Sequence, residues 1–259
     1  MHLIQEEIKP LLSVHHLQIK NQQQVLVEDL SFELKQGETL AIVGESGSGK
    51  SISSLALLGL LPQNLQISGE ALFQNKNLLT LNQQALQSIR GQHIAMIFQE
   101  PMTALNPLHR VEKIIGEPLL LKGNSKQEVR LKTIQLLNDV GLSDAEAKLR
   151  RYPHELSGGQ RQRVMIAAAL ALEPDILIAD EPTTALDVTL QAQVLDLLKE
   201  LIQQRNMAMI LISHDLNLVR HYAQYVIVMN QGVVEEQGPV EAVFTQAKAS
   251  YTQHLLNHD

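Results

Sequence analysis

Residues Gly44–Ser51 read GESGSGKS and match the phosphate-binding pattern GxxxxGK[ST]. The pattern follows an apolar run, Thr39–Val43, and precedes a helical stretch, Ile52–Leu61, which is the context that such a loop requires. Glycines let successive backbone amides face a phosphate, and the start of the helix adds the positive end of its dipole. We expect the Lys50 ammonium to reach the β- and γ-phosphates of a nucleotide and the Ser51 hydroxyl to bind Mg²⁺. The whole loop comprises Gly44, Glu45, Ser46, Gly47, Ser48, Gly49, Lys50 and Ser51.

Two adjacent carboxylates follow a second apolar run, Ile176–Ala179. A phosphate-binding loop needs a further magnesium ligand at the end of a neighbouring strand, and Asp180 is suited to hold the metal directly or through water. Glu181 is then the candidate to orient or deprotonate a water beside the γ-phosphate. An acid at a strand end is, taken alone, better explained as a solvated group, so both assignments depend on the companion loop.

The segment Leu156–Gln160 reads LSGGQ and offers a second set of residues suited to phosphate. Ser157 is a natural N-cap for the helical stretch Arg161–Leu172, and Gly158 and Gly159 allow a ligand to approach the backbone. A capped helix start explains the same residues without any ligand, and the presence of the first loop is what favours the phosphate interpretation.

A predicted lobe separates the two phosphate segments, so we do not expect them to serve one nucleotide within one subunit. A two-fold dimer resolves this, because its interface can set the Lys50 loop of one subunit opposite the Ser157 helix of the other. Two ATP molecules are then sandwiched between the subunits. Hydrolysis removes the γ-phosphate that links the halves, which converts a chemical step into opening of the dimer.

The elements that must position these residues read as an α/β fold. Five short apolar runs alternate with helical stretches and predict buried parallel strands. These runs are Thr39–Val43, Ile94–Phe98, Ile176–Ala179, Met209–Ser213 and Tyr225–Met229. Two imperfectly alternating runs, Leu12–Leu17 and Gln24–Leu34, predict an antiparallel pair, and Asn230–Gly232 predicts a hairpin turn.

The middle of the chain has no strand pattern between Met102 and Leu172. Ser125–Val140 shows helical spacing, with Ser125 as N-cap and Gly141 as stop. We expect a single domain, residues 1–259, in which residues 1–101 and 173–259 form the α/β core and residues 102–172 an inserted helical lobe. The glutamine-rich stretch Leu81–Gln92 predicts a solvated helix and loop.

The composition narrows the class of protein. The net charge is -7, which argues against a general binder of nucleic-acid backbones. The chain has no cysteine, which excludes disulfides, thiolate zinc sites and iron–sulfur clusters and is compatible with a reducing cytosol. The start MHLIQEEIKP lacks the regions of a signal peptide, and the apolar run Leu55–Leu61 is far shorter than the roughly 18 residues of a membrane helix. If the protein acts at a membrane, we expect another chain to hold it there.

The chain resembles the ATP-binding subunits of ABC transporters over essentially its whole length. The resemblance lies in the ordered series GESGSGKS, Gln99, LSGGQ, ILIADE and His214. It implies a P-loop NTPase fold of the ABC ATPase type, with a RecA-like, mostly parallel sheet core, an N-terminal antiparallel β subdomain and an inserted helical subdomain. It also implies that Leu156–Gln160 form the signature motif, which binds the ATP of the partner.

Further roles come from the same resemblance. Gln99, after the run Ile94–Phe98, is similar to the residue that senses Mg²⁺ and the γ-phosphate and couples to the membrane subunit. Ala185, Leu186 and Asp187 resemble the D-loop that crosses the dimer interface, and His214 resembles the switch histidine at the γ-phosphate. The implied cofactors are ATP and Mg²⁺, with Glu181, His214 and Gln99 as catalytic residues and Ser51, Gln99 and Asp180 around the metal.

Longer phrases resemble the oligopeptide/dipeptide branch, including the duplicated ATPases of microcin-type peptide importers. They are QEPMTALNP at Gln99–Pro107, RYPHELSGGQRQRVMIA at Arg151–Ala167, ADEPTTALDVT at Ala179–Thr189 and YTQHLL at Tyr251–Leu256. This branch implies a peripheral ATPase at the cytoplasmic face of the plasma membrane that powers peptide import. Its implied partners are a second ATPase domain, integral membrane permease subunits and, indirectly, a substrate-binding protein, without nucleic acid. Importers of nickel and other small solutes have related ATPases, so the cargo stays open.

Two departures from the family stand out. The family usually stacks adenine on an aromatic residue after the first strand, whereas Gln18–Gln22 contains none. Lys20 or a neighbour could cover the base with its aliphatic stem, and the adenine contact stays open. Many branch members continue beyond YTQxLL, whereas this sequence stops at Asp259, which suggests a short subunit or one half of a two-ATPase chain.

Two other function classes remain as alternatives. The first is a soluble ABC-type ATPase that acts on DNA or ribosomes, although such proteins usually carry coiled coils, zinc modules or a second cassette, and the span from Lys50 to Ser157 has no long heptads or cysteines. The acidic balance also disfavours it. The second is a regulatory module without turnover, which the carboxylates Asp180 and Glu181 together with His214 disfavour.

Overall fold

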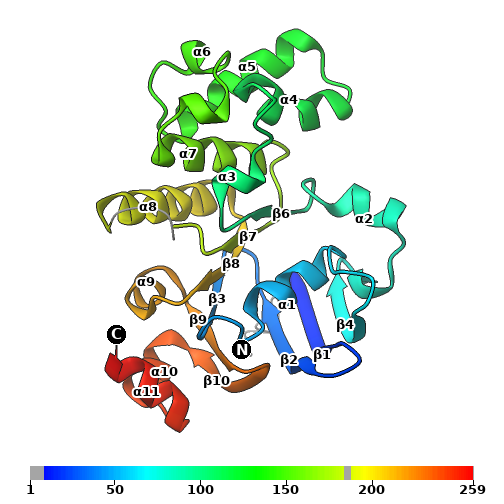
Figure 1. Cartoon of the computed structure of the whole chain (residues 1–259), viewed down its shortest axis with the longest axis vertical. Helices are drawn as coiled ribbons and strands as arrows, with labels where there is room; N and C mark the ends of the chain where they lie inside the picture. The colour runs from blue at the N-terminus through cyan, green and yellow to red at the C-terminus, as the bar shows by residue number, and fades with distance from the viewer. Residues whose placement is uncertain (1–8, 184–187, 259) are drawn as a thin grey trace, which may run out of the picture. The chain divides into compact units, whose positions relative to one another are not determined.

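The computed structural model describes residues 9–183 and 188–258. These residues form two compact units, and most of their helices and strands are labelled in Figure 1. The first unit contains the described residues of Met1–Leu86 and Ser213–Asp259, and the second contains those of Gln87–Ile212. None of the helices in the described part of the chain combines the length and the apolar character that a membrane span needs.

A four-stranded antiparallel sheet opens the first unit, with the strand order β2-β1-β4-β5. The central strand β1 runs antiparallel to both β2 and β4, so the two N-terminal runs predicted to pair do pair. The strands are β1 (Leu12–Lys20), β2 (Val25–Leu34), β4 (Gln66–Phe73) and β5 (Lys76–Asn77).

A bulge in β1 explains why its apolar pattern alternates imperfectly. Val14 and Leu17 are both fully buried, although residues three apart in a regular strand point to opposite faces. The pairing register shifts between them, and His16 has a φ of 50°. The bulge thus returns Leu17 to the buried face. Gly69 on β4 lies against it, because a Cβ at this glycine would be 2.3 Å from the backbone oxygen of His16.

A second ladder of the first unit leads into the phosphate-binding loop. β9 (Tyr225–Asn230) runs parallel to β3 (Thr39–Val43) and antiparallel to β10 (Val233–Pro239). Gln231 and Gly232 join β9 to β10 with φ values of 46° and 86°. Two successive positive φ angles suit a tight hairpin, so the predicted turn is confirmed.

The helices of the first unit follow or flank these strands. The helix after β3 begins at Lys50, earlier than predicted, and ends at Leu57, because Gly59 with a φ of 59° breaks it. The full set is α1 (Lys50–Leu57), η1 (Leu78–Thr80), α9 (Leu216–Tyr222), α10 (Val240–Thr245) and α11 (Ser250–His258).

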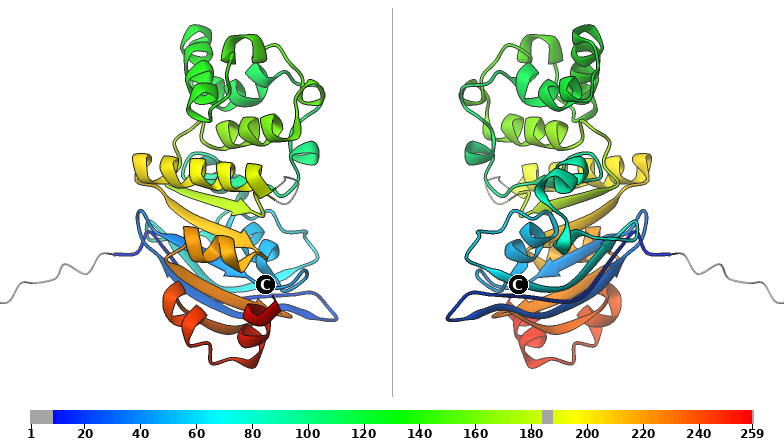
Figure 2. Two further views of the ribbon diagram at one scale, coloured as in Figure 1. Left: turned by 90° about the vertical axis from the view of Figure 1, so that its left-hand side faces the viewer. Right: turned by 90° about the vertical axis from the view of Figure 1, so that its right-hand side faces the viewer.

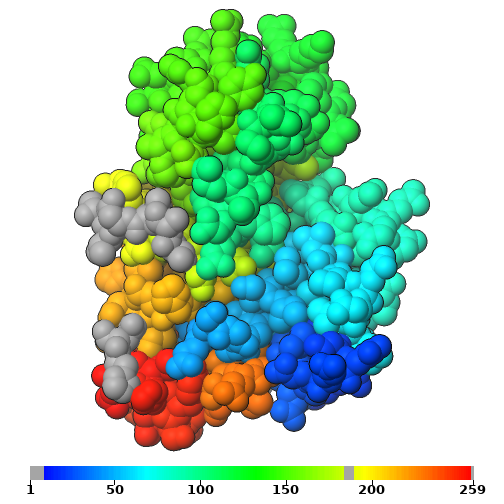
Figure 3. Space-filling view, viewed as in Figure 1, coloured from blue at the N-terminus to red at the C-terminus, as the bar shows by residue number. Residues whose placement is uncertain are grey.

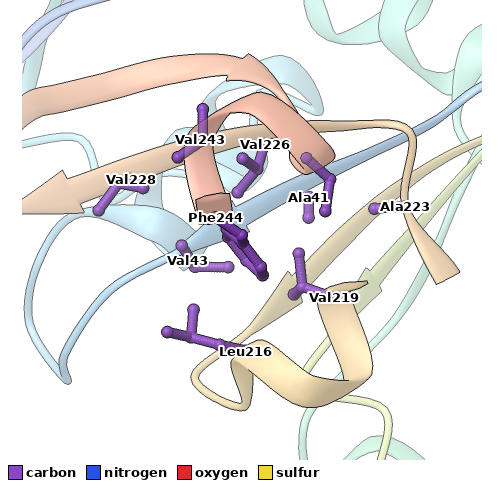
Figure 4. Close-up of a cluster of buried hydrophobic side chains, with 10 residues drawn as sticks. Ala41, Val43, Leu216, Val219, Ala223, Val226, Val228, Val243 and Phe244 are labelled. Atoms are coloured by element: carbon purple, nitrogen blue, oxygen red, sulfur yellow. The ribbon is translucent and has the colours of Figure 1, made fainter. Parts of the chain in front are cut away.

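A buried apolar cluster joins β3 and β9 to the C-terminal helices (Figure 4). Ala41 and Val43 of β3 contribute to it, and Val219 of α9 and Phe244 of α10 close it. Tyr251, Leu255 and Leu256 of α11 pack against this cluster. The strand that enters the phosphate-binding loop and the last helix of the described chain therefore share one core.

Three parallel strands form the sheet of the second unit. β7 (Ile176–Asp180) pairs with β6 (Ile94–Ile97) on one side and with β8 (Ala208–Ser213) on the other. Every residue of the three strands is buried, as expected for parallel strands covered on both faces. Phe98, predicted as the last residue of its strand, lies outside β6 and is 41% exposed.

Helices occupy the sequence between β6 and β7, as the absence of a strand pattern there predicted. They are α3 (Pro101–Ala104), α4 (Val111–Leu121), α5 (Lys126–Asp139), α6 (Ala145–Lys148), η2 (Pro153–Glu155) and α7 (Gly158–Ala169). α2 (Gln83–Ile89) precedes β6, and α8 (Val188–Arg205) follows β7. Leu86 and Ile89 of α2 are buried, so the glutamine-rich stretch is solvated on one face only. The expected helical lobe, residues 102–172, falls wholly within the second unit. Its role as a separate subdomain stays a prediction.

The capping signals in this region behave as predicted. Ser125 caps α5 in a capping box with Glu128, whose pKa is lowered by the hydrogen bond from the Ser125 backbone N–H. Gly141, with a φ of 71°, follows the end of the helix. α7 contacts α3, α4, α5 and β6, and it lies beside α8 (Figures 1 and 2). It is therefore the central helix of the second unit.

We predict that Gly69→Ala lowers the melting temperature more than Gly123→Ala. Both glycines have φ near the left-handed region, +100° and +90°, so both variants carry backbone strain of about 1 kcal/mol. Only the Gly69 variant also meets a backbone oxygen, whereas nothing lies within 4 Å of a Cβ at Gly123. Thermal unfolding followed by circular dichroism measures the difference. Equal melting temperatures of the two variants would contradict the role assigned to the bulge.

Candidate nucleotide-binding site

The loop between β3 and α1 has a backbone that requires glycine at both ends. Gly44 has a φ of 146°, and a Cβ there would lie 2.0 Å from the carbonyl oxygen of Met229 on β9. Gly49 has a φ of 105° and occupies the N-cap of α1. Because glycine has no side chain, no capping group at this position competes with an anion for the amides of the first helical turn.

The Lys50 side chain is folded back into this loop and is only 5% exposed. Its Nζ donates hydrogen bonds to the carbonyl oxygens of Gly44 and Glu45 at 2.7 and 2.8 Å, and Ser48 Oγ lies 3.5 Å away. Ser51 follows in the first turn of α1 and is half-buried. A buried ammonium beside the positive end of a helix makes a site for a multiply charged anion, and these residues fit a nucleotide phosphate with its Mg²⁺.

The hairpin between β9 and β10 is hydrogen-bonded to the phosphate-binding loop. The Gly232 N–H donates to the Ser48 carbonyl oxygen at 3.0 Å, and the Gly232 carbonyl oxygen accepts from the Glu28 N–H on β2 at 2.8 Å. A Cβ at Gly232 would lie 2.7 Å from the Leu26 carbonyl oxygen. The antiparallel sheet and the loop are thus joined through one glycine. The sequence marked Gly232 as a turn residue but gave no sign of this contact.

The predicted carboxylates stand at the end of β7 in the second unit. Asp180 is the last residue of the strand and is 6% exposed. Glu181 follows with a φ of 45°, and its N–H donates to the Ile212 carbonyl oxygen at 3.0 Å. Gln99, just after β6, donates from Nε2 to Glu181 Oε2 at 2.9 Å. The structure therefore brings Gln99 and Glu181 together, with Glu181 in a strained conformation of the kind found at functional sites.

The LSGGQ segment forms the start of α7. Ser157 is its N-cap: Ser157 Oγ accepts from the Gln160 N–H at 3.3 Å, and Gln160 Oε1 accepts from the Ser157 N–H at 3.2 Å. Ser157 and Gly158 are exposed, and a Cβ at Gly158 would meet nothing within 4 Å. The fold itself therefore places no steric demand for glycine at position 158.

His214 belongs to the first unit and lies between the last residue of β8 and the start of α9. It follows the last residue of β8, Ser213, and precedes Asp215, whose side chain caps α9 by accepting from the Leu218 N–H at 3.0 Å. The Asp215 N–H in turn donates to Ser213 Oγ at 3.0 Å. The backbone at His214 is therefore held on both sides, and its side chain is exposed.

Comparison with known families agrees with this arrangement. The family described as ABC transporter matches residues 27–184, which include the Lys50 loop, Gln99, LSGGQ and both carboxylates. The chain belongs to the ABC transporter family.

Relatives of this ABC transporter chain include proteins named for peptide transport. The peptidoglycan transport ATP-binding protein YejF of Agrobacterium fabrum is 53% identical over 96% of the chain and 47% of its own length. The dipeptide transport ATP-binding protein DppD of Lactococcus lactis is 49% identical over 89% of the chain and 67% of its own length. The chain thus spans about half to two thirds of the length of these relatives.

Solved structures of ABC cassettes share the fold. CbiO1 of Clostridium perfringens, part of the cbiONQ transporter complex, superposes with a TM-score of 0.79 at 29% identity, covering 92% of the chain and 91% of its own. The ATP-binding cassette MJ0796, in a dimeric post-hydrolysis structure with ADP and Pi, gives 0.77 at 29% identity over 88% and 98%. The expected α/β fold of the ABC ATPase type, with an N-terminal antiparallel sheet, is therefore confirmed.

Two expectations from the family resemblance, the D-loop and the adenine contact, stay predictions. The D-loop residues Ala185, Leu186 and Asp187 lie outside the described residues. In the region Gln18–Gln22, β1 ends at Lys20, and Asn21 Oδ1 accepts from the N–H groups of Gln23 and Gln24 at 2.8 and 2.7 Å. Asn21 thus stabilises the turn between β1 and β2. The residue that contacts adenine is not assigned.

We predict that Gly44→Ala weakens nucleotide binding by the isolated ABC chain by about tenfold or more, because the loop must deform to admit a Cβ against Met229. The same substitution at Gly158 is expected to leave binding within about twofold, since its Cβ enters open space. Titration of each variant with a fluorescent ATP analogue measures both. Equal losses in the two variants would contradict the assignment of the primary phosphate site to the Lys50 loop.

Proposed function

We propose that this ABC transporter chain binds and hydrolyses ATP with Mg²⁺ and thereby drives a membrane partner. The observation that carries the proposal is the Lys50 ammonium, buried among the carbonyl oxygens of its own loop at the start of α1. Such a charge is costly to bury unless an anion or several acceptors surround it. A triphosphate provides the matching negative charge.

We assign a separate chemical role to each of the candidate side chains. Ser51, Gln99 and Asp180 would hold Mg²⁺, which when bound neutralises charge on the phosphate oxygens. Glu181 would accept a proton from the attacking water, and His214 would contact the γ-phosphate. The Gln99–Glu181 hydrogen bond supports this division, because it fixes the orientation of the carboxylate before substrate binds.

A second ATPase domain would complete each nucleotide site. The exposed Ser157 and the open backbone at Gly158 support contact with the ATP of a partner. The dimeric MJ0796 cassette with ADP and Pi supports the same arrangement by likeness. Binding of ATP would close the head-to-tail dimer, and hydrolysis would open it, with the D-loop at residues 185–187 crossing the interface.

The membrane partner would be an integral permease that imports peptides. Relatives named for dipeptide and peptidoglycan transport support the cargo class. Exposed apolar side chains precede Gln99 in the sequence at Phe98 and follow it at Met102 and Leu108. Such a group suits an apolar protein contact, so the segment Pro101–Glu117 would transmit closure to the permease at the cytoplasmic face of the membrane. A substrate-binding protein would deliver the peptide on the other side.

We predict that Glu181→Gln binds ATP but hydrolyses it about 10²- to 10⁴-fold more slowly, since the variant keeps the shape of the side chain and loses the base. It should persist as a closed dimer in ATP, as judged by gel filtration. Glu200→Gln, an equal change at an exposed position of α8, is the matched control and should retain wild-type turnover. A wild-type hydrolysis rate for Glu181→Gln would rule out its assigned role.

A tagged pull-down from detergent-solubilised native membranes tests the transport part. We expect two polytopic membrane proteins to be recovered with the chain, with ATPase activity in the complex. Recovery of nucleic acid or ribosomes without membrane proteins would leave the proposed ATPase activity in place and contradict the proposed role in transport.

A further inference from the structure

The last helix of the described chain touches the phosphate-binding loop. The Glu45 backbone N–H donates a hydrogen bond to the Tyr251 hydroxyl oxygen of α11, with 3.3 Å between nitrogen and oxygen. Figure 3 shows the blue loop that follows β3 beside the red C-terminal helices. The contact joins the YTQHLL segment to the second residue of GESGSGKS, and neither motif by itself indicates it.

The Glu45 residue is held from two sides. The Glu45 carbonyl oxygen accepts a hydrogen bond from Lys50 Nζ at 2.8 Å, while the Glu45 N–H donates one to the Tyr251 hydroxyl oxygen. A rotation of the peptide groups around Glu45 would strain both hydrogen bonds together. The Tyr251 hydroxyl therefore stabilises the same loop conformation that holds the ammonium in place.

Helix α11 is itself anchored, which gives the hydroxyl a defined position. The Glu236 carboxylate on β10 accepts from the Lys248 N–H at 3.0 Å and from the Ala249 N–H at 3.1 Å, immediately before the helix. Burial alone would raise the pKa of Glu236, but the two N–H donors hold this pKa below its ordinary value. The side chain that anchors α11 is therefore a carboxylate at neutral pH. The helix also packs through Leu255 and Leu256 on the cluster drawn in Figure 4.

The Tyr251 side chain remains a neutral phenol. Burial raises the pKa of Tyr251 above its ordinary value, and the hydrogen bond from the Glu45 N–H opposes this rise only in part. The carboxylates of Glu45 and Glu235 raise the pKa further. The hydroxyl thus keeps its proton, and its oxygen stays available to the Glu45 N–H across the neutral range.

We propose that Tyr251 is a positioning residue for the phosphate-binding loop, through which α11 raises the affinity of the chain for nucleotide. The proposal rests on the proposed nucleotide-binding function of Lys50. It gives the YTQHLL segment a physical role at the ATP site. Tyr251 acts through the backbone of Glu45 and is not assigned a contact with substrate.

The test is removal of the hydroxyl with the ring kept. Tyr251→Phe is expected to weaken binding of a fluorescent ATP analogue about two- to tenfold, the range for loss of one hydrogen bond. Tyr225→Phe is the matched control, because Tyr225 begins β9 whereas the loop meets Met229 near the other end of that strand. Without nucleotide, both variants should melt within about 2 °C of wild type. A smaller nucleotide-induced rise in melting temperature is expected for Tyr251→Phe alone.

A second variant tests whether the helix acts through this hydroxyl. Glu236→Ala loosens the anchor of α11 and should also weaken nucleotide binding, but by less in the Tyr251→Phe background than in wild type. Additive losses, or a Tyr251→Phe chain that binds as tightly as wild type, would overturn the inference and leave the nucleotide site intact. If wild type binds no better than Lys50→Ala, the proposed function fails, and the inference fails with it.

Discussion

The buried ammonium of Lys50 is the constraint on which the first unit depends. A charged group with 5% exposure loses several kcal/mol of hydration unless acceptors surround it. The loop supplies these acceptors by turning the carbonyl oxygens of Gly44 and Glu45 inward. That turn requires a positive φ at Gly44 and leaves no room for a side chain beside Met229. β3, which leads into this loop, pairs in parallel with β9, and Val43 lies opposite Val228, the residue before Met229.

The second unit holds two acidic side chains, Asp180 and Glu181, at the end of β7. Its parallel strands deliver side chains to one edge, and β7 ends there with Asp180 nearly buried. The chain then bends sharply at Glu181, whose positive φ is tolerated because its N–H is bound by Ile212 and its carboxylate by Gln99. Local strain is thus offset by neighbouring hydrogen bonds, and the carboxylate is held in one orientation.

The central helix α7 has opposite requirements along its length. Its middle is buried through Val164 and Ile166, which fixes it among α3, α4 and α5. Its start is exposed at Ser157 and Gly158, and a Cβ at Gly158 would meet nothing within 4 Å. A rigidly packed helix with an open N-terminus is suited to present its first amides to a ligand held by another chain.

Local patterns in the sequence determined the strands, the caps at Ser125 and Ser157, and the phosphate-binding loop, because each depends on residues within one or two turns of the chain. The family resemblance added Gln99, which the structure places on Glu181. Only the tertiary structure decided the bulge at His16, the support of the loop by Gly232 and the contact of Tyr251 with Glu45, 206 residues apart. Hydrogen bonds between such distant residues depend on how strands and helices pack, and no local periodicity records that packing.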